Sequence, residues 1–257
     1  MNLSRIFTLA SNVFWDVIRE RVLYLTGFFA ILLVAAQALL REVSAGTEAK
    51  MLADVGIAAI GVLGLIVTVF VGTGLINKEI DKRTVLVLLS KPVSRSEFII
   101  GKHIGLSAVL AVLIALMTGI YLGTLSFYKI PYPLGSILVA ALYLFLELSL
   151  LTAVGILFGV FTSSLLATLL TFAVYVMGHL SRDLLQLGEL SKNPTIKNLT
   201  QTIYLVIPDL ARFDLKNEAV YGLLPDTVTL LVSAVYGLVY IALLLALANL
   251  IFWRREF

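Results

Sequence analysis

Six long apolar runs constrain this chain more than any other feature of its sequence. They cover residues 22–40, 55–76, 104–127, 137–161, 165–180 and 228–252. About 20 residues of helix cross the roughly 30 Å of hydrocarbon in a bilayer. In lipid, runs of this length satisfy their backbone hydrogen bonds only as helices, and none alternates at the two-residue period of a barrel strand. The sequence therefore predicts an all-α polytopic membrane protein with six transmembrane helices.

The composition agrees with a membrane protein and excludes several other classes. Hydrophobic residues make up 60 % of the 257 positions and charged residues 14 %, whereas soluble domains contain about 25 % charged residues. The net charge of +3 does not indicate nucleic acid, because the basic residues are interleaved with acidic ones at a membrane face. The absence of cysteine excludes disulfides and thiolate metal sites. His103 and His179 fall on opposite predicted faces of the membrane, so no metal site is expected.

Lysine and arginine residues are divided unequally between the two faces of the membrane. With both termini inside, the cytoplasmic segments hold eleven of them and the short outer loops hold three. Short cytoplasmic loops carry the excess of positive charge in membrane proteins. We therefore expect both termini to be cytoplasmic.

Residues 1–21, before the first run, are predicted to form an interfacial amphipathic helix. Apolar side chains recur at the i, i+3, i+4 and i+7 positions of one helix face. They are Leu3, Ile6, Phe7, Ala10, Val13, Phe14 and Val17. Such a helix lies in the membrane interface, with Trp15 near the depth of the lipid headgroups. The pattern fits a simple membrane anchor as well as an element that docks on a partner protein.

A polar interruption, residues 77–103, separates the second and third runs and contains six lysine or arginine residues. We expect a short helix over residues 78–90 that ends before Pro92, because the residue before a proline avoids helical geometry. Ser94 and Glu97 have the spacing of a capping box, so a second helix starts here and continues into the third span. This predicts a rigid cytoplasmic coupling helix with an elbow at Pro92. The alternative is an ordinary solvated basic loop.

The same interruption carries three short motifs. They read E-I-D-K-R-T at 79–84, L-L-S-K-P-V-S-R at 88–95 and E-F-I-I-G-K at 97–102. These resemble the E-x-x-x-x-T, L-L-S-x-P-V-S-R and E-F-x-x-G-K signature of ABC-2-type transporter permease subunits. The resemblance is closest to the branch associated with multi-copper enzyme maturation, such as nitrous-oxide reductase assembly. Many members have Gly-Thr where this chain has Arg83-Thr84, so the local turn is expected to differ.

The resemblance implies a transmembrane subunit of an ATP-driven exporter in the inner (plasma) membrane of a prokaryote. It also implies a homodimer that works with two copies of a cytoplasmic ABC ATPase. Seven residues would lie in or beside the coupling element that docks on this ATPase: Glu79, Arg83, Thr84, Pro92, Arg95, Glu97 and Lys102. Glu79 and Arg95 are the candidates for charged contacts with it.

The chain itself supports the need for a partner. It has no G-x-x-x-x-G-K-[ST] phosphate loop, so ATP and Mg are expected in the ATPase subunit, and no cofactor or catalytic activity is expected here. The whole chain is interpreted as one ABC-2-type transmembrane domain with six segments. These are residues 1–21, 22–76 (spans 1 and 2), 77–103, 104–180 (spans 3 to 5), 181–227 and 228–257 (span 6 and a cytoplasmic tail).

A single charged residue, Glu147, lies near the middle of the fourth span. A charge at that depth costs about 2.5–3.5 kcal/mol on insertion scales, so a partner, water or protonation is expected. We interpret Glu147 as the intramembrane candidate for a functional role. The alternative is a structural carboxyl that pairs with Tyr143 one turn earlier or with a hydroxyl group of another helix. No second charged residue accompanies it within the predicted spans.

Residues 181–227, on the outer side, are polar with apolar islands. Ile196, Leu199, Ile203 and Val206 have the spacing of a short amphipathic helix. This segment is a candidate external gate or docking site for an extracytoplasmic accessory protein. A plain surface connection is the alternative.

Three other function classes compete with the permease. An ion-coupled carrier without an ATPase would depend on Glu147, although carriers usually show more intramembrane polar residues or helix breaks. A membrane scaffold would recruit partners without transport. An intramembrane enzyme is disfavoured because the sequence has no G-x-S-x-G motif, no H-E-x-x-H motif and no pair of intramembrane carboxylates.

Overall fold

The computed structural model describes residues 2–43, 48–81, 94–191 and 193–254, and all regular structure in this part of the chain is helical. Six of the described helices are long and apolar enough to cross a membrane. They are α2 (Tyr24–Val43), α3 (Glu48–Asp81), α5 (Arg95–Phe127), α6 (Leu134–Phe161), α7 (Ser164–Leu190) and α10 (Thr227–Arg254). The predicted all-α fold with six spans is confirmed.

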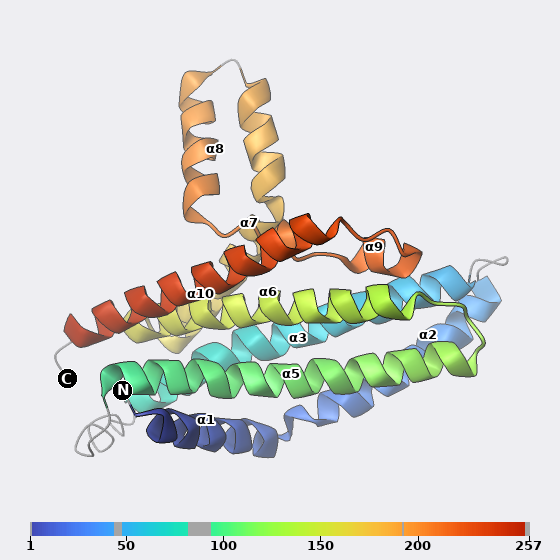
Figure 1. The fold of residues 1–257 in the computed structure, drawn as a ribbon, viewed down its shortest axis with the longest axis horizontal. Coiled ribbons are helices and arrows are strands. Elements are labelled where there is room, and N and C mark those ends of the chain that lie inside the picture. The colour runs from blue at the N-terminus through green and yellow to red at the C-terminus, as the bar shows by residue number, and fades with distance from the viewer. Residues whose placement is uncertain (1, 44–47, 82–93, 192, 255–257) are drawn as a thin grey trace.

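Helices α3, α5 and α6 form the core of the bundle, and α6 is the most buried of the six long helices. In Figure 1, α2, α3, α5, α6 and α10 run along the same long direction. Small residues let these helices approach closely. A Cβ atom at Gly64 on α3 would lie 2.5 Å from Leu148 Cδ1 on α6. Tyr121 on α5 is fully buried and donates a 2.8 Å hydrogen bond to the carbonyl oxygen of Ala53 on α3.

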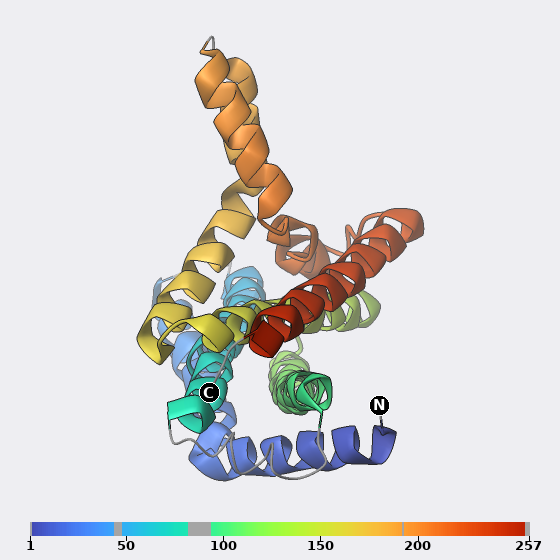
Figure 2. The same cartoon turned by 90° about the vertical axis from the view of Figure 1, so that its left-hand side faces the viewer.

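Helix α1 (Leu3–Val17) lies across one end of the bundle and packs on the first turns of α5, as Figure 2 shows. A five-residue π-helical turn (Ile18–Val22) leads from α1 into α2. The predicted helix is confirmed, and its inward face, Ile6, Ala10, Val13 and Val17, is buried against protein. Two aromatic residues of the expected membrane face remain on the surface, since Phe7 is 76 % and Trp15 54 % exposed. The interfacial position of α1 stays a prediction.

The start of α5 has the expected capping box. The Ser94 hydroxyl accepts a 3.2 Å hydrogen bond from the Glu97 N–H, and the Ser94 N–H donates a 2.9 Å bond to the Glu97 carboxylate. Helix α3 continues through Asp81, so the first residues of the helix expected over 78–90 belong to α3. The remainder of that helix and the elbow at Pro92 lie outside the described residues.

Helix α7 extends to Leu190, well beyond the predicted fifth span at 165–180. The physical reason is that no proline interrupts the sequence until Pro194, where helix α8 (Pro194–Val206) begins. Helix α8 confirms the short amphipathic helix expected in the outer segment. It pairs with the end of α7 to form a hairpin that projects away from the bundle in both views (Figures 1 and 2).

The chain then returns to the bundle. A short 3₁₀ turn (Leu210–Arg212) contacts α7, and helix α9 (Lys216–Tyr221) packs on α3 and α6. Helix α9 ends at Gly222, whose φ of 69° is in the left-handed region that favours glycine. Part of the segment expected to be a polar outer connection is therefore packed against the transmembrane core.

Candidate functional site

The intramembrane carboxyl of Glu147 is almost completely enclosed by protein. It lies on α6, is 1 % exposed, and its Oε1 atom is 3.5 Å from Nε2 of His179 on α7. His179 itself is oriented by the ring of Tyr175, whose centroid is 4.5 Å away, and by a 3.1 Å contact between Nδ1 and the Tyr175 carbonyl oxygen. Tyr143, a partner considered from the sequence, donates its hydroxyl to the carbonyl oxygen of Leu230 on α10 instead.

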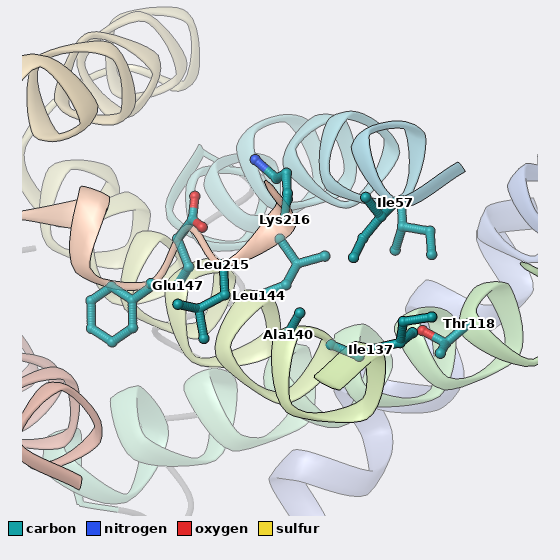
Figure 3. A pocket seen from close by; sticks show the side chains of 11 residues that line it. Ile57, Thr118, Ile137, Ala140, Leu144, Glu147, Leu215 and Lys216 are labelled. Carbon is teal, nitrogen blue, oxygen red and sulfur yellow. The ribbon is translucent and has the colours of Figure 1, made fainter. Parts of the chain in front are cut away.

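A cation from residues 181–227, which are predicted to lie outside the membrane and are called the outer segment below, approaches the same carboxyl. Lys216 on α9 passes over Gly61 of α3, where a Cβ atom would lie only 3.1 Å from Lys216 Cε. Lys216 and Glu147 line one buried cavity, and Figure 3 shows their polar ends in the same region of it. The charged companion of Glu147 therefore comes from outside the predicted spans. No local pattern in the sequence indicates this pairing, because Lys216 belongs to a segment that pattern alone places outside the membrane.

A second carboxylate keeps Lys216 charged. Its Nζ atom is 3.4 Å from Oδ1 of Asp214. Burial alone would disfavour the ammonium, but the negative charges of Asp214 and Glu147 outweigh it and raise the pKa of Lys216 above its usual value. Glu147, His179, Lys216 and Asp214 together form a charge cluster that joins α6, α7 and the outer segment.

The cavity beside this cluster is small and mostly apolar. Its volume is about 10 Å³, and Ile57, Ile137, Ala140 and Leu144 contribute to its walls. This is about the smallest space that can hold one water molecule. The cluster can bind a proton or a water-sized guest and can hold α9 on the bundle, but the cavity is too small for a transported solute.

A second group of charges ties the hairpin to the bundle. Asp209 is buried, and its Oδ2 atom is 2.9 Å from Nε of both Arg182 on α7 and Arg212. The Asp209 N–H donates a 3.0 Å hydrogen bond to the hydroxyl of Tyr236 on α10, and the Arg212 guanidinium lies 4.9 Å from the centroid of that ring. Asp209 therefore connects α7, the 3₁₀ turn and α10.

The first turn of α5 is bonded to the start of α1 and to the end of α10. The N–H of Asn2 donates a 2.6 Å hydrogen bond to Oε1 of Glu97. Nη1 of Arg95 donates to the carbonyl oxygens of Phe252 and Trp253, at 3.0 and 2.6 Å, so it caps the last turn of α10. The start of α1 and the end of α10 therefore both contact the first turn of α5.

Close backbone contact strengthens the junction of α1 and α5. A Cβ atom at Gly101 would lie 2.8 Å from Cβ of Leu9, and one at Gly105 would lie 2.6 Å from the carbonyl oxygen of Ala10. These two glycines are four residues apart on α5, the spacing at which small residues let two helices approach closely. Helix α1 and the first three turns of α5 therefore form one packed unit.

The residues expected to couple to an ATPase are only partly described. Arg95, Glu97 and Lys102 lie in this unit; Glu97 and Lys102 are buried, and the Lys102 ammonium is 5.5 Å from the centroid of the Phe98 ring. Glu79 belongs to the last turns of α3, but the structure does not describe its side chain. Arg83, Thr84 and Pro92 lie outside the described residues. The coupling role of all seven stays a prediction.

The two histidines lie in different environments. Nε2 of His103 is 3.1 Å from the carbonyl oxygen of Ser149, whereas His179 faces Glu147. Within the described ranges, no group of three or more His, Asp or Glu side chains is placed to hold a metal ion.

Comparison with known protein families identifies the class of this protein. The family model for the ABC-2 family transporter protein matches residues 8–257, which is nearly the whole chain. The chain belongs to this family, and it is a membrane subunit of an ABC transporter. A search of curated proteins found no match to the sequence.

Proposed function

We propose that this chain is the permease of an ABC exporter and that α1 with the start of α5 receives the movement of a cytoplasmic ATPase. The observation that carries the proposal is the packed unit described above, in which Gly101 and Gly105 bring α1 against α5. The family-like motifs span residues 79–102, so they run from the end of α3 into this unit. In the proposed complex, two copies of the chain work with two ABC ATPase subunits, which bind ATP and Mg.

The proposed mechanism follows from the stiffness of this unit. Helix α5 runs without interruption from Arg95 to Phe127 and forms part of the core with α3 and α6. A displacement of its first turn is therefore passed along the core instead of being absorbed by a loop. Arg95 extends the same displacement to α10, because it bonds to the last carbonyl groups of that helix.

We place the transport path between two copies of the chain. The buried cavity within one copy has a volume of only about 10 Å³, whereas most residues of α2, α7 and α10 are not buried within that copy. The finer assignment to the branch for multi-copper enzyme maturation rests on the three motifs alone. On that interpretation, the α7–α8 hairpin contacts an extracytoplasmic accessory protein. The division of lysine and arginine residues supports cytoplasmic termini in a prokaryotic inner membrane.

Co-purification with the ABC ATPase encoded beside this chain tests the proposal. The double charge reversal Glu79→Lys with Arg83→Glu should weaken the complex and abolish stimulation of ATP hydrolysis by the permease. The matched control reverses two charges at the opposite end of α3, Glu48→Lys with Lys50→Glu, and should leave the complex intact. An unchanged complex in the first variant, or no association in the parent chain, would contradict the proposal.

The charge cluster around Glu147 supports a second candidate, an ion-coupled carrier. Its buried carboxyl lies 3.5 Å from His179 and shares a cavity with Lys216. Transport in proteoliposomes separates the two functions. A carrier would work with an ion gradient and no ATPase, whereas the proposed permease requires ATP and its partner.

A further inference from the structure

An open groove runs between the first half of α5 and the second half of α10. It consists of two adjoining hollows with volumes of about 680 and 490 Å³. Ser96, Ala246 and Asn249 line both hollows, so the two are parts of one continuous surface. The cavity beside the charge cluster around Glu147 shares no residue with this groove.

One end of the groove is polar and cationic. Ser94, Arg95 and Trp253 line it together with the shared residues, and Ser96 donates a 3.1 Å hydrogen bond to Asn249. Nη1 of Arg95 is held by the two carbonyl oxygens of α10, which orients the guanidinium at the rim. An arginine has five N–H donors, and three of these are on Nε and Nη2. The nearest carboxylate in the sequence, Glu97, bonds to Asn2 and Ser94 and does not line the groove.

The other end of the groove is apolar. Its walls are Ile99 and Ile100 of α5 and Leu238, Ile241, Ala242 and Leu245 of α10. This part lies along two membrane-spanning helices, at increasing distance from the bundle end that carries Arg95. Trp253, 70 % exposed at the polar end, is the residue type that collects at the boundary between headgroups and hydrocarbon.

We infer that this groove binds a phospholipid with an anionic headgroup from the leaflet at the α1 end of the bundle. The phosphate lies at Arg95, where the positive end of α5 adds to the guanidinium charge. One acyl chain follows the apolar half past Ala242 and Leu238. A soluble anion would contact only the polar half of the groove. An amphiphile contacts both the polar and the apolar half, so the groove favours an amphiphile.

Trp253 provides a direct reporter for this site. The chain contains two tryptophans, and Trp15→Phe leaves Trp253 as the only one. The purified chain is placed in nanodiscs with increasing fractions of phosphatidylglycerol or phosphatidylcholine carrying brominated acyl chains, which quench tryptophan on contact. We expect half-maximal quenching at a fraction of phosphatidylglycerol about fivefold lower than the fraction of phosphatidylcholine that is needed. One basic residue near the surface raises the affinity for an anionic lipid by about this factor.

Two variants and a control complete the test. Arg95→Gln should remove the preference for phosphatidylglycerol, whereas Arg19→Gln, an exposed arginine beside α1 and outside the groove, should retain it. Because Arg95→Gln also loses bonds to α10, Ala246→Phe is the second variant. It adds bulk where the two hollows join, at a residue that is not a hydrogen-bond partner of Arg95, and should reduce quenching by both lipids. Equal quenching by the two lipids in the Trp15→Phe parent would overturn the anionic selectivity, and quenching that Ala246→Phe leaves unchanged would overturn the site.

Discussion

Lys216 of the outer segment and Glu147 of the fourth span line one buried cavity, although they are far apart in the sequence. This shared cavity changes how both residues are interpreted. Glu147 is not an isolated charge in the membrane, and Lys216 is not a solvated surface residue. Helix α9 is held on the bundle where an intramembrane carboxyl attracts its lysine.

Removing this lysine should destabilise the protein more than removing both charges. Lys216→Met removes the cation that lies 3.4 Å from Asp214 and attracts Glu147. Because both side chains of the Lys216–Asp214 pair are partly exposed, the expected loss is about 1–3 kcal/mol, below the range for a fully buried ion pair. Glu147→Gln in the same chain should recover part of the loss, with a coupling energy of about 0.5–3 kcal/mol. Thermal unfolding of the two single variants and the double variant in detergent measures this coupling. Lys197→Met, on the exposed face of α8, is the matched control, and strictly additive effects of the first pair would refute the interaction.

Gly105→Ala should loosen α1 from α5. The added methyl group would lie 2.6 Å from the carbonyl oxygen of Ala10 and 2.7 Å from Val13 Cβ, and overpacking of this kind costs about 1–3 kcal/mol. Gly119→Ala is the control on the same helix, because nothing lies within 4 Å of its new atom.

Hydrogen exchange of α1 measures the effect, together with the ATPase stimulation of the assembled complex. Faster exchange and lost stimulation are expected only for Gly105→Ala. Normal coupling in a variant whose α1 has become mobile would argue against α1 as the element that receives the movement.

Asp209→Asn should release the α7–α8 hairpin from the bundle. The change removes the carboxylate charge that holds Arg182 and Arg212, each at 2.9 Å. Hydrogen bonds to charged groups contribute about 1.5–3 kcal/mol, and the exposure of Arg182 places the effect at the lower end of this range. Limited proteolysis between α7 and α8 should be faster in this variant than in Asp183→Asn, which alters an exposed carboxylate of the same helix. Equal cleavage rates would show that Asp209 does not anchor the hairpin.

The start of α10 should lose stability at acidic pH. The Thr229 hydroxyl and N–H both donate to the Asp226 carboxylate, at 2.5 and 3.2 Å, and lower the pKa of Asp226 below its usual value. Because the folded pKa is below the unfolded one, this contribution is fully present above about pH 4 and is lost as the pH falls through the folded value. The difference in Tm between the parent and Asp226→Ala should therefore be constant from pH 7 to 5 and shrink at lower pH. A difference independent of pH would exclude the charge as its cause.

Local features of the structure were predictable from the sequence. The long apolar runs became helices because a backbone in lipid must satisfy its own hydrogen bonds. The capping box of Ser94 and Glu97 also formed as its spacing predicts. Helix α8 was expected from the positions of Ile196, Leu199 and Ile203. Each of these depends on residues within a few turns of one another.

Contacts between distant segments were decided only by the tertiary structure. Arg95 was expected to face a partner protein, yet it also caps the end of α10. The outer segment was expected to be a polar connection, yet Lys216 lies beside Glu147 because Gly61 leaves room for its side chain. Hydrophobic length determines where each helix forms, since this is a property of one segment and its solvent. Which buried charges meet depends on how the helices pack, and that depends on shapes and small residues contributed by several segments at once.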